Sequence, residues 1–335
     1  MDFINWGLIG FGNVVKNNLN GLPFNTQKSK VYAFHQRNSN EAVINKEKYD
    51  IDKFYPNISD LLLDKNVNAI YICTPPGLHF KYAKLCCEYN KPTYIEKPFA
   101  RNYLEVCQIV EYFKEKNIPL WIAHYKRTLP KFIQVKSIIN NNTIGKITNV
   151  TYFCERPFSS SLLNHKWLYN IELSGGGRFF DIAPHLIDLL VFFLGNFESV
   201  YSVISNNCQH YNTEDVVSFN FKTSSNVIGT VNFNFISSRR FDLMTIYGTE
   251  GNISFSLEGG GDINLVSKYK TKTYSFSEPL IYEKNMIEAI NTELLENKFN
   301  NNICHGSDAI ETYRIIDLIL NDFYNGRNRE FWRNQ

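Results

Sequence analysis

The first 124 residues alternate short apolar runs with helix-like segments, and this alternation limits the fold more than any other feature of the chain. Residues 4–12 read as a strand that runs into a glycine turn. Further strands are expected at 31–36, 69–76, 92–98 and 120–124, and helices at 58–65, 79–90 and 102–117. Strands that alternate with helices form a parallel, doubly wound sheet. We therefore predict an α/β domain of Rossmann type over residues 1–124.

The pattern changes after Pro130. A helix at 132–145 leads into a strand at 147–156 and a glycine-led apolar helix within 174–195. Period-2 strands follow, at 199–206, 216–223, 227–237, 241–249 and 251–257, and helices at 280–297 and 307–325 close the chain. Alternating strands separated by turn residues indicate a largely antiparallel sheet. Residues 125–335 are therefore expected to form an α+β domain with a large, mostly antiparallel sheet.

Composition narrows the kind of partner. The 335 residues are 44% apolar and carry a formal net charge of +2, with no long basic run. We expect a small-molecule partner, and neither nucleic acid nor an anionic membrane. The first strand begins within a few residues of Met1, and the apolar run at 189–195 is too short to span a bilayer, so a cytoplasmic protein is expected. Seven cysteines without a CxxC pair favour reduced core residues.

The glycine turn has the spacing of a dinucleotide site. Gly10 and Gly12 follow the first strand, and Asn13 and Val14 open the next helix, where backbone amides can meet a pyrophosphate. Val15 stands where a third small residue is usual. This motif by itself is weak, but its place in the first βαβ unit strengthens it.

The end of the second strand bears on the choice of cofactor. It carries Gln36 and Arg37 where an acidic residue would bind the ribose of NAD. A site without that carboxylate, and with a guanidinium beside it, favours NADP over the alternative, NAD. The competing interpretation is that Arg37 is only a solvated loop residue.

Two further strands end in loops that should face the same ligand. In an open parallel sheet, ligands bind beyond the carboxyl ends of the strands. The predicted ligand-facing residues of these loops are Thr74, Pro75, His79, Glu96 and Lys97. For Lys97, an ordinary surface lysine is an equally good interpretation at this point.

Three polar residues interrupt the apolar helix that follows Gly175–Gly177. Asp181, His185 and Asp188 are spaced four and three residues apart, which places them on one stripe of a helix. One interpretation is structural: Asp181 caps the helix, Pro184 lies in its first turn, and His185 is a hydrogen-bonded core residue. The other is that the stripe is the wall of a site.

These motifs together resemble the glucose-fructose oxidoreductase and inositol dehydrogenase (Gfo/Idh/MocA) family. The resemblance rests on Gly10-x-Gly12, TPPGLH at 74–79, EKP at 96–98 and GGGxxxDxxxH at 175–185, and GTEGNISF at 248–255 extends it toward the C-terminus. It implies a nicotinamide oxidoreductase that acts on a sugar, cyclitol or related polyol. Lys97, Asp181 and His185 would be the catalytic residues, and Asp188 would be structural. It also places Tyr125, Arg127 and Trp167 beside the substrate.

The implied chemistry leaves several alternatives open. His185 could exchange the proton of the reacting oxygen, oriented by Asp181, while Lys97 stabilises the alkoxide. Alternatively, Lys97 carries the proton, which would require a pKa far below about 10.4. No metal-ligand cluster stands out, so a metal-independent reaction is expected. A non-catalytic sensor on the same fold is the alternative function. The open sheet implied by the family suggests a homodimer or homotetramer.

Overall fold

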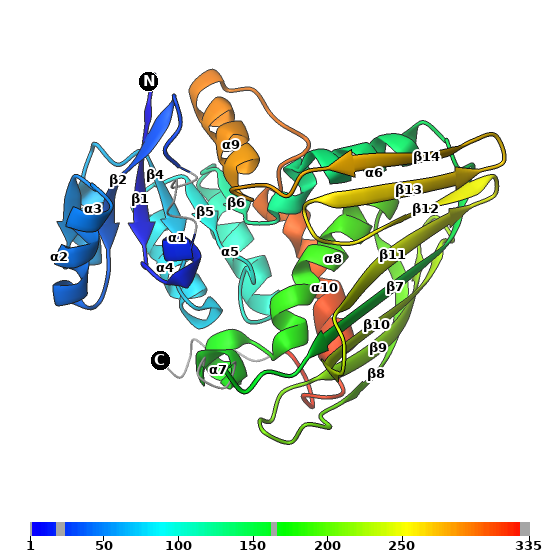
Figure 1. The fold of residues 1–335 in the computed structure, drawn as a ribbon. Coiled ribbons are helices and arrows are strands. Elements are labelled where there is room, and N and C mark those ends of the chain that lie inside the picture. Colours follow the sequence, from blue (N-terminus) through cyan, green and yellow to red (C-terminus); the bar gives the residue numbers. More distant parts are fainter. Residues whose placement is uncertain (1, 18–23, 162–165, 329–335) are drawn as a thin grey trace.

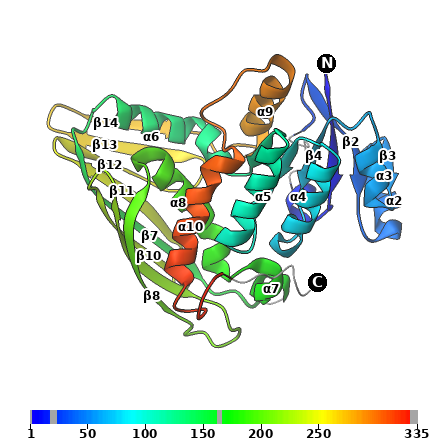
Figure 2. The same cartoon turned by 180° about the vertical axis from the view of Figure 1, so that it is seen from behind.

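The fold, given by a computed structural model, consists of two sheets with helices between and around them (Figures 1 and 2). The structure describes residues 2–17, 24–161 and 166–328. One sheet has six strands and the other has eight. We refer to them as sheet A and sheet B.

Sheet A is parallel throughout and has the strand order β3-β2-β1-β4-β5-β6. Its strands are β1 (Ile4–Ile9), β2 (Ser29–His35), β3 (Lys53–Tyr55), β4 (Ala69–Ile72), β5 (Thr93–Ile95) and β6 (Leu120–Ile122). The strand order reverses between β1 and β4, as in Rossmann folds, and this leaves a crevice at their carboxyl ends. The predicted doubly wound parallel sheet is confirmed.

Helices cover both faces of sheet A, as its nearly continuous apolar strands require. They are α1 (Asn13–Asn17), α2 (Ser39–Lys48), α3 (Ile58–Leu63), α4 (His79–Glu88) and α5 (Tyr103–Glu115), together with the 3₁₀ turns η1 (Pro76–Leu78) and η2 (Tyr125–Thr128). Asn102 caps α5 by accepting a hydrogen bond from the amide of Glu105. Val106, Ile109, Val110 and Phe113 then form its buried face. These spacings explain why α5 could be predicted.

Sheet B has the order β14-β13-β12-β11-β7-β10-β9-β8, and only β7 and β10 pair in parallel. Its strands are β7 (Ile147–Pro157), β8 (Phe197–Ser205), β9 (Val216–Thr223), β10 (Ile228–Ser237), β11 (Phe241–Gly248), β12 (Gly251–Phe255), β13 (Gly261–Ser267) and β14 (Thr271–Phe276). The mostly antiparallel sheet is confirmed. The last two strands were not predicted, because their residues are largely exposed and lack a sustained apolar alternation.

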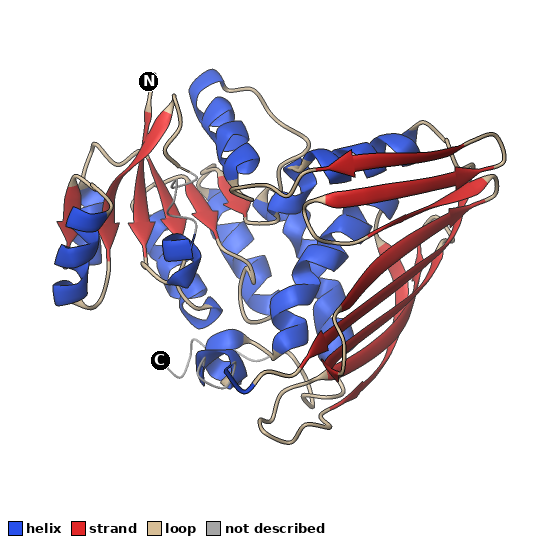
Figure 3. Cartoon of the chain, viewed as in Figure 1, coloured by secondary structure: helices blue, strands red, loops and turns tan. Residues whose placement is uncertain are grey.

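The remaining helices link the two sheets (Figure 3). They are α6 (Pro130–Asn140), η4 (Lys166–Tyr169), α7 (Ile171–Ser174), α8 (Arg178–Leu194), α9 (Lys284–Glu296) and α10 (Gly306–Leu320). The Phe179 ring of α8 packs edge-on against Phe219 and Phe233 of sheet B. Helix α9 returns to sheet A, where Asn291 accepts a hydrogen bond from the Trp6 indole. The C-terminal third of the chain thus contacts both sheets.

The cysteines and the lengths of the helices bear on the expected redox state and compartment. All seven cysteines are free, and most are buried. In the described part of the chain, no helix is long and apolar enough to cross a membrane.

Candidate active site

Two adjoining cavities open at the carboxyl ends of the strands of sheet A. The first, of about 230 Å³, lies at the ends of β1 and β2, and we name it the outer groove. The second, of about 390 Å³, extends from the same strand ends to Asp181 of α8, and we name it the reaction cavity. They share Gly12, Cys73, Thr74 and Pro75. A ligand that occupies both would cross the point where the strand order reverses.

The glycines at 10 and 12 form the bridge between the two cavities. Gly10 has φ +99°, and a Cβ there would lie 3.0 Å from Thr74 Cγ2 and 3.1 Å from the Cys73 backbone. A Cβ on Gly12 would meet nothing within 4 Å, because that face is open. Asn13 begins α1, and Val14 lines the reaction cavity. The turn therefore leaves the backbone accessible, as a pyrophosphate group requires.

The loop after β4 adds a hydrogen-bonding group to the same surface. Thr74 and Pro75 line both cavities, and Thr74 Oγ1 is buried without a hydrogen-bond partner in the described structure. Buried hydroxyls are normally paired, so this one is suited to bind a ligand. These residues fit a dinucleotide cofactor.

His79, which the sequence predicts to bind cofactor, is not among the residues that line either cavity. Its ring is fully buried, with Nδ1 3.1 Å from the Phe99 carbonyl oxygen and Nε2 2.7 Å from that of Thr74. Burial lowers its pKa to about 4. The ring ties the loop after β4 to the loop after β5, and so supports the cavity from behind.

Gln36 and Arg37 lie where the sequence predicts them, in the outer groove. No carboxylate is among the described residues that line this groove. Gln36 accepts a hydrogen bond of 2.9 Å from Asn45, and Arg37 is exposed. Tyr82 also lines this groove. Burial raises the pKa of its phenol, and the positive charge of Arg37 lowers it.

Lys97 and Asp181 meet across the reaction cavity. Lys97 Nζ lies 2.9 Å from Asp181 Oδ1 and 3.1 Å from the Asp181 carbonyl oxygen. Burial lowers the pKa of Lys97, but the charges of Asp181 and Glu96 outweigh it and leave the pKa above its ordinary value. Lys97 is therefore a fixed cation joining sheet A to α8.

Two buried carboxyl groups, those of Glu96 and Glu283, lie beside Lys97, and Glu283 was not predicted. Glu96 accepts hydrogen bonds from Tyr71 Oη at 2.5 Å and from the Lys97 amide at 2.9 Å. Burial raises the pKa of Glu283 well above its usual range, and the neighbouring Glu96 raises it further. Two buried carboxyls in direct interaction share a proton, since both cannot ionise. Glu283 lies just before α9, far from the motif in sequence, and no local signal could have revealed it.

His185 follows Asp181 by one turn of α8, is 8% exposed, and is not among the residues that line the reaction cavity. Its ring centroid is 4.7 Å from that of Tyr125 and 6.1 Å from that of His124. Neither ring nitrogen has a hydrogen-bond partner within the described residues. Burial lowers its pKa well below 6.5, and the charge of Lys126 lowers it further. The prediction that Asp181 orients His185 is wrong, because the Asp181 carboxylate binds Lys97.

The start of α8 excludes the alternative in which Asp181 caps the helix. The cap is Gly177, and Glu214 accepts hydrogen bonds from the amides of Gly177 and Phe180. Pro184 is inside the helix and not in its first turn. Because Glu214 satisfies the helix amides, the side chain of Asp181 is free to bind Lys97.

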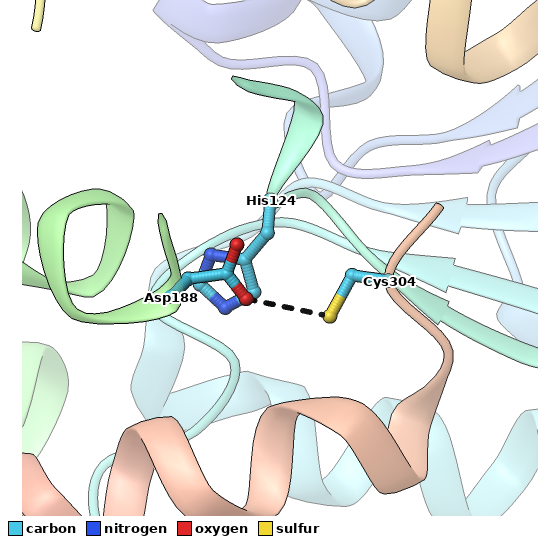
Figure 4. A group of neighbouring side chains, drawn as sticks. All are labelled: His124, Asp188 and Cys304. Atoms are coloured by element: carbon cyan, nitrogen blue, oxygen red, sulfur yellow. Dashed lines mark hydrogen bonds between the residues drawn. The ribbon is translucent and has the colours of Figure 1, made fainter. Parts of the chain in front are cut away.

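Arg127, which the resemblance places beside the substrate, is not among the residues that line the reaction cavity. Its guanidinium donates hydrogen bonds of 2.8 and 2.6 Å to the two oxygens of Asp188, and both side chains are almost fully buried. His124 and Cys304 complete this cluster, with Cys304 Sγ 3.7 Å from Asp188 Oδ1 (Figure 4). The structural role expected of Asp188 fits this geometry. Since Arg127 occupies both carboxylate oxygens, the cluster is an ion pair lined by two further polar groups.

The other predicted substrate residues lie close to the reaction cavity. Trp167 lines it directly, whereas Tyr125 is not among the lining residues and packs against the His185 ring. Lys126, which was not predicted, is a second lysine near His185, and burial lowers its pKa to about 8. It follows Tyr125 in the turn after β6, and only packing could distinguish it from a solvated lysine.

Comparison with known proteins agrees with this architecture. Residues 4–124 match the model of the oxidoreductase family with an NAD-binding Rossmann fold, and residues 132–254 match that of the GFO/IDH/MocA C-terminal domain. Oxidoreductase P35 of Formosa agariphila is 31% identical over 320 residues, which cover 94% of this chain and 98% of that protein. Levoglucosan dehydrogenase of Pseudarthrobacter phenanthrenivorans is 29% identical over 143 residues, covering 42% of this chain and 37% of that one.

Solved structures show the same fold over nearly the whole chain. A levoglucosan dehydrogenase in complex with NADH and levoglucosan superposes with a TM-score of 0.84 at 20% identity, covering 96% of this chain and 97% of the other. An oxidoreductase from Agrobacterium radiobacter, in complex with NAD+, L-tartaric acid and magnesium, gives 0.85 at 15% identity and covers 99% of both chains. The chain therefore belongs to the GFO/IDH/MocA family of nicotinamide-dependent oxidoreductases.

Proposed function

We propose that the protein is an NADP-dependent dehydrogenase or reductase that acts on a CH–OH group of a sugar, cyclitol or related polyol. The observation that carries this proposal is the Lys97–Asp181 ion pair in the reaction cavity, with His185 one helical turn further along α8. Relatives of the chain include a myo-inositol 2-dehydrogenase from Thermotoga maritima and the levoglucosan dehydrogenase, both of which act on polyhydroxylated rings.

The catalytic roles follow from the charge state of each side chain. The bound nicotinamide would supply the hydride chemistry. Lys97 keeps its positive charge, because Asp181 and Glu96 raise its pKa, and so it stabilises the developing alkoxide. His185 stays neutral at pH 7, because burial lowers its pKa, and a neutral imidazole can accept the hydroxyl proton during oxidation. These pKa directions favour His185 over Lys97 as the proton carrier.

The preference for NADP rests on the outer groove. Arg37 is exposed at this groove, and no carboxylate is among the described residues that line it. A 2′-phosphate there would meet a positive charge and no opposing negative one, whereas NAD would lack its usual acidic ribose partner.

One experiment tests both parts of the proposal. NADPH and NADH are titrated by nicotinamide fluorescence, and a panel of sugars and polyols is assayed with the tighter cofactor. We expect tighter binding of NADPH, which Arg37→Asp abolishes. We also expect His185→Asn and Lys97→Met to lose turnover while they still bind cofactor, and the exposed Lys222→Met to behave as wild type. Equal turnover in the wild type, His185→Asn, Lys97→Met and Lys222→Met would contradict the assigned site.

The outer face of sheet B supports the proposal of a homodimer or homotetramer. Phe153 of β7 and Leu243 of β11 are cross-strand partners and are 42% and 36% exposed. Tyr201 and Val203 of β8 are 74% and 79% exposed. Exposed apolar groups gathered on one sheet face favour an interface. Light scattering should therefore give a mass of at least twice 39.0 kDa, reduced to the monomer in Phe153→Lys/Leu243→Asp.

A further inference from the structure

A group of unpaired polar side chains surrounds the first residue of α8, outside the catalytic trio. Arg178 begins the helix and has no carboxylate partner within the described residues. Three hydroxyl oxygens close to it, those of Tyr169, Tyr211 and Thr213, are buried and have no hydrogen-bond partner there. A folded protein seldom leaves this many polar atoms unpaired in one place, so a ligand is the natural partner.

The contacts show that these side chains form one cluster. The rings of Tyr169 and Tyr211 stack 4.2 Å apart at 14°. The charge of Arg178 lowers the pKa of both phenols, against burial, which raises it. Thr213 Oγ1 lies 2.6 Å from where a Cβ would stand on Gly177, the residue before Arg178. The β8–β9 loop that carries Tyr211 and Thr213 lies at the same end of the molecule as α7 (Figures 1 and 2).

The Arg178 guanidinium is held in position, and among the described residues no carboxylate pairs with it. Its guanidinium lies 5.1 Å from the centroid of the buried Phe235 ring, a contact that orients it. The nearby carboxylates are bound elsewhere. Asp181 binds Lys97, Glu214 binds the Gly177 and Phe180 amides, and Asp215 binds the Asn207 and Cys208 amides. Since Glu214 also occupies the end of the helix, the attraction for an anion comes from the Arg178 side chain.

The cluster adjoins the proposed reaction centre. Arg178 precedes Asp181 by three residues, which places the two roughly 5 Å apart along the helix axis. The Tyr169 phenol also feels the charge of Asp181, and its neighbours Trp167 and Leu168 line the reaction cavity. The cluster therefore borders the wall of the reaction cavity that Trp167, Leu168 and Asp181 form.

We propose that Arg178, with the hydroxyls of Tyr169, Tyr211 and Thr213, binds a carboxylate of the substrate, so that the protein acts on a sugar acid. This inference rests on the proposed function, which it narrows from polyols in general. A guanidinium matches the two oxygens of a carboxylate, and the three hydroxyls can donate to the same group. One guanidinium cation fits a group with a single negative charge.

The test compares acids with neutral sugars of matched stereochemistry. The pairs are D-glucuronate with D-glucose, D-galacturonate with D-galactose, and D-gluconate with D-sorbitol. Turnover is measured as kcat/KM, and binding by protein fluorescence on the NADPH-loaded protein. We expect at least one acid to exceed its neutral partner by on the order of 100-fold, the effect of about two charge-assisted hydrogen bonds.

Variants assign the preference to this cluster. Arg178→Gln should remove most of it by raising KM for the acid, while the neutral sugars stay unchanged. Arg178→Lys should keep part of it, and Tyr211→Phe should weaken it several-fold. Arg239→Gln, an exposed arginine paired with Glu155 on sheet B, is the matched control. Melting temperatures verify that each variant is folded.

Failure of this inference differs from failure of the proposed function. If neutral sugars are turned over as efficiently as the acids, and Arg178→Gln changes neither, the proposed carboxylate site is refuted. The proposed oxidoreductase function is then retained. Absence of turnover with every probe would count against the proposed substrate class. Even then, acid binding that is lost in Arg178→Gln would support the carboxylate site, and equally weak binding of acids and neutral sugars would refute it.

Discussion

Removing one partner of the buried pair formed by Arg127 and Asp188 should strongly destabilise the protein. The side chains are 5% and 1% exposed and are joined by two hydrogen bonds. Asp188→Asn removes the negative charge and leaves the buried Arg127 only the longer contact with the partly exposed Asp308, 3.8 Å away. Breaking a buried pair in this way costs about 3–5 kcal/mol. Against a typical total of about 5–15 kcal/mol, this is a large fraction of the free energy of unfolding.

Equilibrium urea unfolding, followed by intrinsic fluorescence, measures this cost. Arg127→Met/Asp188→Leu, which removes both charges, should recover most of the stability, because no uncompensated charge remains. The control is Arg239→Gln, which breaks a pair with exposures of 65% and 22% and should cost less than about 1 kcal/mol.

Two results would refute this reasoning. One is a cost of less than about 1 kcal/mol for Asp188→Asn. The other is an Arg127→Met protein of normal stability whose only defect is a raised KM, since that would return Arg127 to the substrate site.

Three further predictions concern pH and backbone conformation. Because burial and Lys126 hold the pKa of His185 well below 6.5, kcat/KM for oxidation should stay level from pH 8 to pH 6, and a decline with a midpoint near 6.5 would contradict a neutral His185. Burial lowers the pKa of His305, but Asp308 and Glu293 raise it to about 9, so its contribution to stability should be complete below pH 6.5 and disappear as the pH rises through 9. Urea unfolding at pH 6 and pH 9.5 tests this, and His305→Gln should reduce the difference between the two. Gly175 has φ +86°, and a Cβ added there would lie 2.7 Å from the Arg101 backbone. Gly175→Ala should therefore lower the free energy of unfolding by more than about 1 kcal/mol. Gly12→Ala, whose added Cβ would meet nothing within 4 Å, should change it by less.

Local patterns in the sequence were sufficient to predict most of the architecture. Strand and helix periods, together with the turn at Gly10 and Gly12, predicted the parallel sheet and the crevice at its carboxyl ends. The same patterns placed Lys97 at a strand end and Asp181 on a helix, and the two meet at 2.9 Å. These features depend on neighbouring residues, whose geometry repeats with a fixed period.

The partner of each polar side chain was decided only by the tertiary structure. His79 and Arg127 lie as close to the motifs in sequence as Thr74 and Lys97 do, yet both are buried against other parts of the chain. Glu283 reaches Glu96 from nearly 200 residues away, and Tyr211 and Thr213 reach Arg178 from the β8–β9 loop. Burial and charge act through space, so the sequence determined which groups were available, and the packing of α8 and α9 against sheet A determined which of them face the cavity.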